Sequence, residues 1–536
     1  MKRLVMLYSV LLLCLFCFSS FTYAKTVTGI VYNDKNKNGN LDRYEKGIRS
    51  VAVSNGSTVT LTDRKGRYSL ELKDGDTLFI SKPSGYFLPL DQNNLPQFYF
   101  NYAPGGTPDD IKLRYPGLKP SGEIEGDLNF PLYRQKEPDR YDVILISDPQ
   151  TTTNEELDYF RDRVVAELAG RKAAFGITTG DIMNDDLSLF PRYSGIIGQL
   201  GIPWFNVPGN HDINYLAADD SRSLDTFRRH FGPAYYSFNW GKVHYVILDT
   251  ILYKGTDPEK RNGSGGYITK LDEKQLRWLK ADLSYVKKNK LIFLAMHAPI
   301  KSAGSDMPEL NMVNPDELFE ALSGFDRVFS IAGHLHGTQH IYFDADDGYK
   351  GKNPLHHHVI TTASGTWWSG AKDVDGIPHS LQPDGTPKGY HIMSVRGNKC
   401  TLKYKAAGKS DDYQMRITLE ETPNKELVSS VPLSRIDRIR IFVNLFDGGE
   451  KSVVSLKIDD GKPYFLKNEM RVDTFAFNIY LDANTFISGR EIISPHIWIG
   501  SLEGEIKLGI HTITVKARDE YGQEHTGRKI FEVVTD

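Results

Sequence analysis

Five short polar motifs in the middle of the chain carry side chains that can bind metal ions. They are Asp148-Pro149-Gln150, Gly180-Asp181, Gly209-Asn210-His211-Asp212, His297 and Gly333-His334-Leu335-His336. Carboxylate and amide oxygens combined with imidazole nitrogens suit manganese, iron or zinc and, where oxygens dominate, magnesium. One such motif alone means little, and the alternative is a set of turn residues and surface histidines. Support for a metal site comes from the positions of the motifs along the chain.

Each motif follows a short apolar run that is typical of a buried strand. The runs are Val143 to Ile146, Phe175 to Thr178, Trp204 to Val207, Leu291 to Leu294 and Val328 to Ile331. Short apolar runs bounded by Gly and Pro indicate strands that are covered on both faces. Ligands of α/β sheets lie beyond the carboxyl ends of such strands. The sequence therefore predicts that the polar motifs meet at one edge of the fold.

Helical patterns lie between these runs. Apolar residues recur with helical spacing at Leu157, Phe160, Val164, Val165 and Leu168, and again at Leu276, Leu279 and Leu283. Alternating strand and helix patterns are typical of a layered α/β domain. We expect this domain to span residues 136–410, after a charged linker that contains proline.

The order of the motifs resembles that of the calcineurin-like metallophosphoesterases, whose pattern runs D-x-H, G-D, G-N-H-[DE], H and G-H-x-H. The resemblance implies two divalent metal ions bridged by Asp181 and hydrolysis of a phosphate ester by a metal-bound hydroxide. By resemblance, the first ion has the ligands Asp148, Gln150, Asp181 and His336. The second has Asp181, Asn210, His297 and His334. His211 is implied as a general acid or phosphate contact. Asp212 either orients His211 or is an N-cap or turn carboxylate.

Gln150 departs from the family pattern, which has histidine at this position. A neutral amide oxygen is a weaker ligand than an imidazole, so the first site should hold its metal less tightly. The change should also shift preference from iron or zinc towards manganese or magnesium, with manganese favoured. A decayed site is the alternative, but every other ligand of the pattern is present.

The flanking regions have the alternating pattern of β domains. Residues 25–135 carry short alternating strands separated by turns, and the segment 62–68 resembles adhesin B-type repeats and transthyretin-like modules. Residues 411–536 alternate in the same way, and segment 508–519 resembles the last hairpin of immunoglobulin-like modules. The prediction is a central α/β metallophosphoesterase sandwich between an N-terminal β-sandwich and a C-terminal immunoglobulin-like β domain. This order also resembles secreted bacterial members of the family.

The N-terminal region contains a second metal motif. Asp34, Asn36, Asn38, Asn40, Asp42 and Glu45, with Gly39 among them, fit the twelve-residue calcium loop D-x-[DN]-x-[DN]-G-x5-E. A strand pattern rather than a helix precedes Asp34, so the motif is not a helix-loop-helix pair. The alternative is a polar hairpin without metal, since the loop has only three carboxylates among these positions.

The first 24 residues have the features of a signal peptide. Lys2 and Arg3 precede an apolar stretch from Val5 to Phe18, and Ala24 ends a plausible cleavage site. An uncleaved anchor is the alternative. Removal of this segment would leave Cys400 as the one cysteine, which suits a bacterial periplasm or cell surface. No later apolar run is long enough to span a membrane.

Composition and the remaining aromatic and histidine residues indicate which partners and pocket residues to expect. The formal net charge is −3 and there is no basic stripe, so nucleic acid is not the expected partner. Trp367 and Trp368 stand between glycines and form either an aromatic wall of a substrate pocket or part of the core. His340 and the run His356 to His358 are interpreted as loop or surface histidines.

The sequence therefore predicts a secreted or periplasmic metal-dependent phosphoesterase. Its substrate would be a phosphorylated small molecule, lipid, sugar or protein, and the motifs do not separate monoesters from diesters. Two alternatives remain open at this point. One is an inactive, calcium-stiffened surface or glycan-binding protein, and the other is a scaffold that presents residues 411–536 to a partner.

Overall fold

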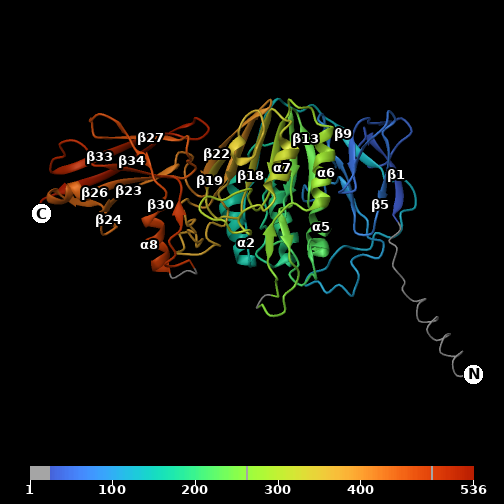
Figure 1. Cartoon of the computed structure of the whole chain (residues 1–536), viewed down its shortest axis with the longest axis horizontal. Helices are drawn as coiled ribbons and strands as arrows, with labels where there is room; N and C mark the ends of the chain where they lie inside the picture. The colour runs from blue at the N-terminus through green and yellow to red at the C-terminus, as the bar shows by residue number, and fades with distance from the viewer. Residues whose placement is uncertain (1–23, 261–262, 484–486) are drawn as a thin grey trace, which may run out of the picture.

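The computed structural model describes residues 24–260, 263–483 and 487–536. Three β-rich parts follow one another along the long axis of the molecule, with the N-terminal part at one end and the C-terminal part at the other (Figure 1). The predicted signal segment, apart from Ala24, lies outside the described residues. Within the described part of the chain, no helix combines the length and the apolar character that crossing a bilayer requires.

The N-terminal part consists of two sheets. The first has the order β2-β1-β9-β7, with β5 paired to the first part of β1, and the second has the order β4-β3-β6-β8. The strands are β1 (Lys25–Asn33), β2 (Lys46–Gly47), β3 (Ala52–Ser54), β4 (Val59–Leu61), β5 (Arg67–Leu72), β6 (Thr77–Ser81), β7 (Tyr86–Phe87), β8 (Tyr99–Asn101) and β9 (Phe130–Arg134). In β5 every second residue is buried, as the alternation of Tyr68, Leu70 and Leu72 predicted.

The N-terminal part packs directly on the central domain. Its buried residues belong to the same apolar core as those of the central strands, and Phe79 meets Trp278 with ring centroids 6.0 Å apart. A buried ion pair crosses the same junction, where Lys82 Nζ lies 2.6 Å from Glu137 Oε1. The two parts therefore share one hydrophobic core.

The central domain is a sandwich of two sheets. One has the order β12-β11-β10-β21-β22 and the other β13-β14-β17-β18-β20-β19. The strands of the first are β10 (Arg140–Ile146), β11 (Phe175–Thr178), β12 (Trp204–Asn206), β21 (Gly389–Arg396) and β22 (Lys399–Ala406). Those of the second are β13 (Tyr236–Trp240), β14 (Val243–Ile247), β17 (Leu291–Ala295), β18 (Arg327–Ala332), β19 (Gln339–Phe343) and β20 (Leu355–Val359). All five predicted strand runs are confirmed, and β10, β11 and β12 are parallel.

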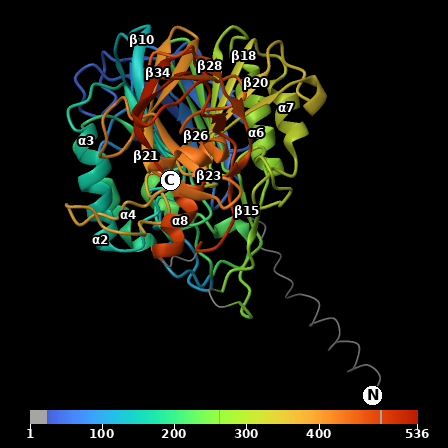
Figure 2. The ribbon, with the colours of Figure 1, turned by 90° about the vertical axis from the view of Figure 1, so that its left-hand side faces the viewer.

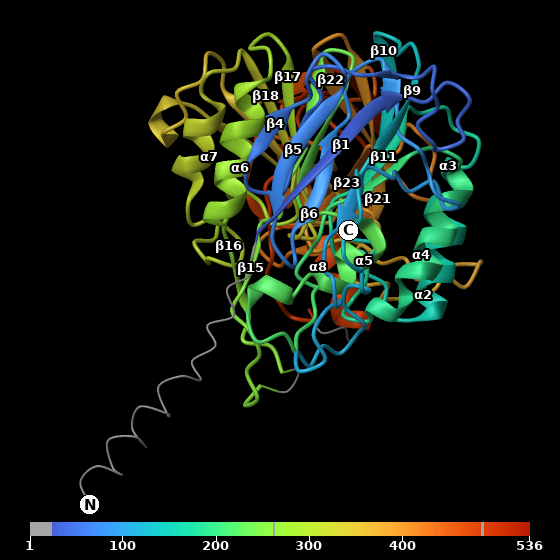
Figure 3. The same cartoon turned by 90° about the vertical axis from the view of Figure 1, so that its right-hand side faces the viewer.

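Helices cover the outer faces of this sandwich (Figure 3). The first sheet is covered by α2 (Asn154–Phe160), η1 (Arg161–Val165), α3 (Ala166–Leu168) and α4 (Phe190–Ile197), and the second by α6 (Glu273–Ser284) and α7 (Pro315–Leu322). The apolar residues predicted to form one helical face, among them Leu157, Phe160 and Val164, are buried against Ile144 and Ile146 of β10. The layered α/β prediction is confirmed.

The C-terminal part again has two sheets, with orders β24-β23-β26-β32-β29 and β25-β34-β33-β27-β28. Its longer strands are β23 (Met415–Glu421), β26 (Ile439–Leu445), β27 (Val453–Ile458), β32 (Ile497–Ser501), β33 (Gly509–Arg518) and β34 (Glu524–Val534), and α8 (Thr474–Ala483) lies beside them. The short strands are β24 (Glu426–Val428), β25 (Ser430–Pro432), β28 (Tyr464–Phe465) and β29 (Lys467–Asn468). Figure 2 views the molecule from this side, with β23, β26 and β34 in front of the central strands. A separate apolar core fills the space between the two sheets. The domain boundaries at residues 135 and 410 stay predictions.

The placement of four histidines differs from the sequence interpretation. His340 lies in β19, and His356, His357 and His358 occupy successive positions of β20. The side chains of His340 and His358 are fully buried. They were expected in loops or on the surface, and that expectation is wrong. Burial is tolerated because neighbouring polar groups bind each ring, which no local pattern in the sequence shows.

Candidate metal centre

All seven predicted metal ligands lie together where the ends of the two central sheets meet. His297 Nε2 is 3.2 Å from Asp181 Oδ1 and 3.1 Å from Asn210 Oδ1. His334 Nδ1 is 3.2 Å from the same His297 nitrogen. The other ligands continue this cluster, with His336 Nε2 2.7 Å from Gln150 Oε1 and 3.8 Å from Asp148 Oδ1.

Unusual backbone geometry aims these side chains. Five of the ligands have positive φ angles, namely Asp148 (43°), Gln150 (39°), Asp181 (46°), His334 (74°) and His336 (48°). Positive φ is uncommon outside glycine, and such strained residues cluster at functional sites. The chain turns sharply at each strand end, so the side chain points back into the cluster.

Two glycines allow these turns to approach one another. A Cβ on Gly333 would lie 2.0 Å from Ser147 Oγ and 2.4 Å from Asp148 Oδ2. A Cβ on Gly209 would lie 2.2 Å from Asp181 Oδ1. The glycines of the motifs are therefore required by close packing against the carboxylates, and any larger residue would push a ligand out of place.

Hydrogen bonds fix which imidazole nitrogens face the cluster. His297 Nδ1 lies 2.8 Å from the carbonyl oxygen of Thr179, and His336 Nδ1 lies 2.5 Å from that of Gly365. A carbonyl only accepts, so both Nδ1 atoms carry the proton. In the neutral rings each Nε2 then presents a lone pair to the cluster, which is the usual arrangement of metal-binding histidines.

In the neutral rings these nitrogens face other acceptors. His297 Nε2 points at the carboxylate of Asp181, and His336 Nε2 points at the amide oxygen of Gln150. Acceptors at 2.7–3.2 Å repel one another unless a proton or a metal ion lies between them. The donor set of carboxylates, amide oxygens and imidazoles fits divalent metals.

The charges of the cluster also attract cations. Burial would lower the pKa of His297, but Asp181 and Asp148 raise it to about 9. Burial, together with His297, lowers the pKa of His334 to about 3, and burial lowers the pKa of His336 as well. His334 and His336 are therefore neutral at physiological pH, and their lone pairs are available to a metal.

His211 stands at the opening of the cluster, with 27% of its side chain exposed. Its Nδ1 lies 2.5 Å from Asp185 Oδ1, and its backbone N–H donates to Asp181 Oδ1 at 2.9 Å. The carboxylate that orients His211 therefore belongs to Asp185. The sequence analysis missed this residue, and its one signal was a second aspartate four positions after Asp181 in the same loop.

Asp212 has a structural role. It is fully buried, and its carboxylate accepts hydrogen bonds from the backbone amides of Gly209, Ile182 and Met183. These bonds tie the Asn210 turn to the Asp181 turn. Asp212 is thus a turn carboxylate that holds two ligand loops together, which was one of its two expected roles, and its carboxylate does not orient His211.

The two adjacent tryptophans have separate environments. The ring of Trp367 stacks on His336, with centroids 4.0 Å apart and an interplanar angle of 19°. Trp368 is buried, and its indole N–H donates to the carbonyl of Pro149 at 2.8 Å. Trp367 therefore holds a ligand ring in place, whereas Trp368 supports the Asp148 turn from the core and does not form an open wall.

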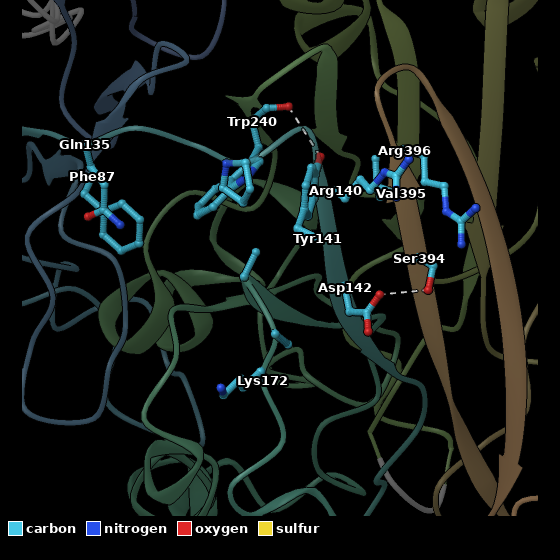
Figure 4. Close-up of a pocket in the computed structure, with 13 residues that line it drawn as sticks. Phe87, Gln135, Arg140, Tyr141, Asp142, Lys172, Trp240, Ser394, Val395 and Arg396 are labelled. Carbon is cyan, nitrogen blue, oxygen red and sulfur yellow. Dashed lines mark hydrogen bonds between the residues drawn. The ribbon is translucent and has the colours of Figure 1, made fainter.

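An open cavity of about 540 Å³ lies elsewhere, at the start of β10 (Figure 4). Its lining includes Arg140, Lys172 and Arg396, and Asp142, which accepts a hydrogen bond from Ser394. Since β10 runs from this cavity towards Asp148, the two sites are at opposite ends of the strand. The lining residues include no histidine. The chemistry is therefore placed at the metal cluster.

The predicted calcium ligands share one loop between β1 and β2. They are Asp34, Asn36, Asn38, Asn40, Asp42 and Glu45. The carboxylates of Asp34 and Glu45 each accept two backbone N–H groups of the loop. The amides of Asn36 and Asn38 both donate to Asp42 Oδ2, at 2.8 and 3.0 Å. The side chains therefore converge, and occupancy by calcium stays a prediction.

Calcium is expected to raise the melting temperature of the full chain without changing turnover. It would bind the folded loop and not the unfolded chain, so it stabilises by mass action. Melting curves with millimolar calcium and with chelator measure the effect. The Glu45→Gln chain, measured in parallel, should lose the calcium-dependent shift and keep the activity of the parent. If the parent and the variant respond alike, the loop is only a polar hairpin.

Replacing Gln150 with His should tighten metal binding at the first site. The imidazole is a stronger donor than the amide oxygen now 2.7 Å from His336 Nε2, and it should shift preference towards iron or zinc. Titration of chelator-treated protein with manganese and zinc measures both effects. Identical titrations for the parent and Gln150→His would show that this residue is not a ligand.

Comparison with known proteins agrees with this geometry. Three sequence models of one family match the chain, the N-terminal part of calcineurin-like phosphoesterases over residues 35–114, the calcineurin-like phosphoesterase part over 141–338 and the C-terminal part over 357–525. A search of curated proteins returned no match.

Two solved structures are similar to parts of the chain. A dimetal phosphatase from Danio rerio is 16% identical, with a TM-score of 0.35, over 50% of this chain and 96% of its own. Purple acid phosphatase PPD1 from yellow lupin (Lupinus luteus) seeds is 12% identical, with a TM-score of 0.36, over 72% of this chain and 67% of its own. The three family matches follow one another along the chain, and the central one contains the five motifs. The chain belongs to the calcineurin-like phosphoesterase family and is a metal-dependent phosphoester hydrolase.

Proposed function

We propose that the chain hydrolyses a phosphate monoester or diester with two divalent ions held at the cluster, and that manganese is the preferred metal. The observation that carries the proposal is the convergence of carboxylate, amide and imidazole ligand atoms, with His297 Nε2 3.2 Å from Asp181 Oδ1 and His336 Nε2 2.7 Å from Gln150 Oε1. Two cations would satisfy both groups. Asp181 would serve as the carboxylate shared by both cations.

Bound divalent ions would supply a nucleophile at neutral pH and neutralise charge on the phosphoryl oxygens. The protein supplies the remaining needs of the reaction. Asp148, Asp181 and the histidines fix the position of the ions, and the Thr179 and Gly365 carbonyls fix the rings. His211 carries a proton at the opening of the cluster. It can deliver this proton to the leaving oxygen, because an imidazolium is an effective general acid near neutral pH.

Asp185 keeps this proton on His211. Burial would lower the pKa of His211, but the charges of Asp181 and Asp185 and the hydrogen bond that the ring donates to Asp185 raise it to about 9. Bound cations would oppose the effect of Asp181, which leaves Asp185 as the group that favours the protonated ring. The partial exposure of His211 gives a substrate access to the proton.

The test is a substrate panel on chelator-treated protein. An aryl phosphate monoester and a bis-aryl phosphate diester are offered with added manganese, zinc, iron or magnesium. We expect hydrolysis that requires added metal and is fastest with manganese. Absence of turnover with both esters and all four metals would contradict the proposal and favour the inactive surface-protein alternative.

The site of action is proposed to be the bacterial periplasm or the outside of the cell. The support is the basic and apolar pattern of residues 1–24, followed by a chain with a single cysteine. Fractionation of expressing cells, followed by sequencing of the new N-terminus, tests the location and the cleavage after Ala24 together. A full-length chain recovered from the cytoplasm would contradict it.

A further inference from the structure

A second group of metal-binding side chains lies at the junction of the central and C-terminal parts. Three histidines, His340, His358 and His391, direct their Nε2 atoms at one carboxylate oxygen of Asp447. The distances to Asp447 Oδ1 are 3.6, 2.9 and 3.2 Å, respectively, and His340 Nε2 also lies 3.3 Å from the backbone carbonyl oxygen of Asp447. The three imidazole rings are fully buried, and 8% of the Asp447 side chain is exposed. This group is separate from the ligands of the catalytic cluster.

Separate elements bring these residues together. His340 and His358 are direct partners in the antiparallel pairing of β19 and β20, and their rings stack with centroids 3.9 Å apart. His391 comes from β21 of the other central sheet. Asp447 lies in the turn that follows β26 of the C-terminal part. The group therefore joins residues of both central sheets to one residue of the C-terminal sandwich.

The far nitrogens of two rings are held by other side chains. His358 Nδ1 is 2.8 Å from the hydroxyl of Tyr521, and His340 Nδ1 is 2.9 Å from His356 Nε2. Such partners fix the orientation of the rings and are the usual outer neighbours of metal-binding histidines. His391 Nδ1, by contrast, has no hydrogen-bond partner among the described residues although the ring is fully buried.

The carboxylate of Asp447 has no lysine or arginine partner among the described residues. All of its ion-pair partners in that part of the chain are histidines. A buried carboxylate is costly without a positive partner.

We propose that His340, His358, His391 and Asp447 bind one divalent metal ion, with zinc as the best fit, as a structural site. Three imidazole nitrogens and one carboxylate oxygen are a donor set of the kind that zinc binds in tetrahedral structural sites. Zinc bonds of about 2.0–2.1 Å place neighbouring ligand atoms about 3.3 Å apart in a tetrahedron. The measured separations from Asp447 Oδ1 span this value. The ligand atoms of His340, His358 and Asp447 lie within 4.8 Å of one another, and His391 approaches this group at Asp447.

A metal at this point would fasten the C-terminal part to the catalytic domain. The His ligands come from the central sheets, whereas Asp447 comes from the C-terminal sandwich, so the metal would bridge the two parts. Four protein ligands leave no open position for a substrate, so the role is structural and not catalytic. This inference does not depend on the proposed function of the first cluster.

The test counts zinc in full-length protein that carries Asp181→Asn, so that binding at the catalytic cluster is weakened. Chelator-treated protein is titrated with zinc in the presence of a competing chromophoric chelator. We expect one tight equivalent in this parent. His391→Ala should weaken that equivalent by more than the 10–100-fold that is typical when an outer neighbour of a metal ligand is lost. Asp447→Ala should do the same.

His357→Gln is the matched control. His357 lies in the same strand and is equally buried, but it bonds to Ser330 and to the backbone of Ile300. The His357→Gln chain should be less stable than the parent but should still bind one equivalent of zinc tightly. Cobalt gives an independent readout, since a tetrahedral cobalt spectrum should appear in the parent and in His357→Gln but not in His391→Ala.

Two results would overturn the inference. One is a parent that binds no tight zinc and shows no tetrahedral cobalt spectrum. The other is a His391→Ala chain with the same zinc affinity and the same zinc-dependent rise in melting temperature as the parent. If Asp447→Ala does not fold, the comparison of His391→Ala with His357→Gln still decides the outcome.

Discussion

The Asp181→Asn chain should lose phosphoesterase activity and bind less metal, while its fold remains intact. Asp181 is almost fully buried, and its carboxylate faces His297 Nε2 on one side and the His211 amide on the other. Asn has the same shape and can still accept the His211 hydrogen bond, but it lacks the negative charge that two cations share. Turnover of an aryl phosphate, metal content and a melting curve together measure the effect.

Asp142→Asn is the matched control for this experiment. Asp142 lies on β10, the same strand that leads to Asp148, but at the opposite end, where it accepts a hydrogen bond from Ser394. The control should keep both metal and turnover. Full activity in Asp181→Asn with an unchanged metal content would show that the two-metal interpretation of the cluster is wrong.

The second large effect is expected for His211. Its replacement with Ala should slow alkyl phosphates by roughly 10²–10⁴-fold, the usual range for a general acid, and activated aryl phosphates much less. The reason is that a poor leaving group needs the proton that His211 delivers, whereas a good one departs without it. Rates on a series of esters with graded leaving-group pKa values give the comparison. An equal loss across the series would instead assign His211 to phosphate contact.

Asp185→Asn should reproduce part of this effect through the pKa of His211. The acid acts only when protonated, so its contribution is present below its pKa and is lost as pH rises through it. Asp185 raises that pKa, and its neutralisation should move the alkaline limb of kcat/KM for alkyl esters to lower pH. Asp186→Asn is a suitable control, because Asp186 caps the next turn through Ser188. An unmoved limb in Asp185→Asn would contradict the role of this pair.

The metal ligands could be predicted from the sequence because each one is encoded locally. An apolar strand is followed by a turn, and the glycine beside the ligand is required by contacts such as that of Gly333 with Asp148. Strand, turn and ligand are therefore visible in a few consecutive residues. Asp185 carries no such signature, since a carboxylate in a polar loop looks the same whether or not it meets a histidine.

The histidine group at Asp447 could not be predicted for a related reason. His358 reaches Asp447 across 89 residues of sequence, and His391 reaches it across 56. The contact exists only once the C-terminal sandwich has docked on the central sheets. Similarly, Asp212 follows directly after His211, yet its carboxylate points at backbone amides. Adjacency in sequence says nothing about which way a turn directs each side chain.

The continuous core between the N-terminal sandwich and the central domain limits where the chain can be divided. A fragment that starts at residue 136 would lack Phe79 and Lys82. Trp278 would then lose its aromatic contact, and Glu137 would lose its buried ion-pair partner. The face around Phe238 and Trp278 would become an exposed apolar patch, which favours aggregation. Chimaeras made from related chains should therefore keep residues 25–410 together from one parent. The N-terminal sandwich is an integral part of the fold of the central domain.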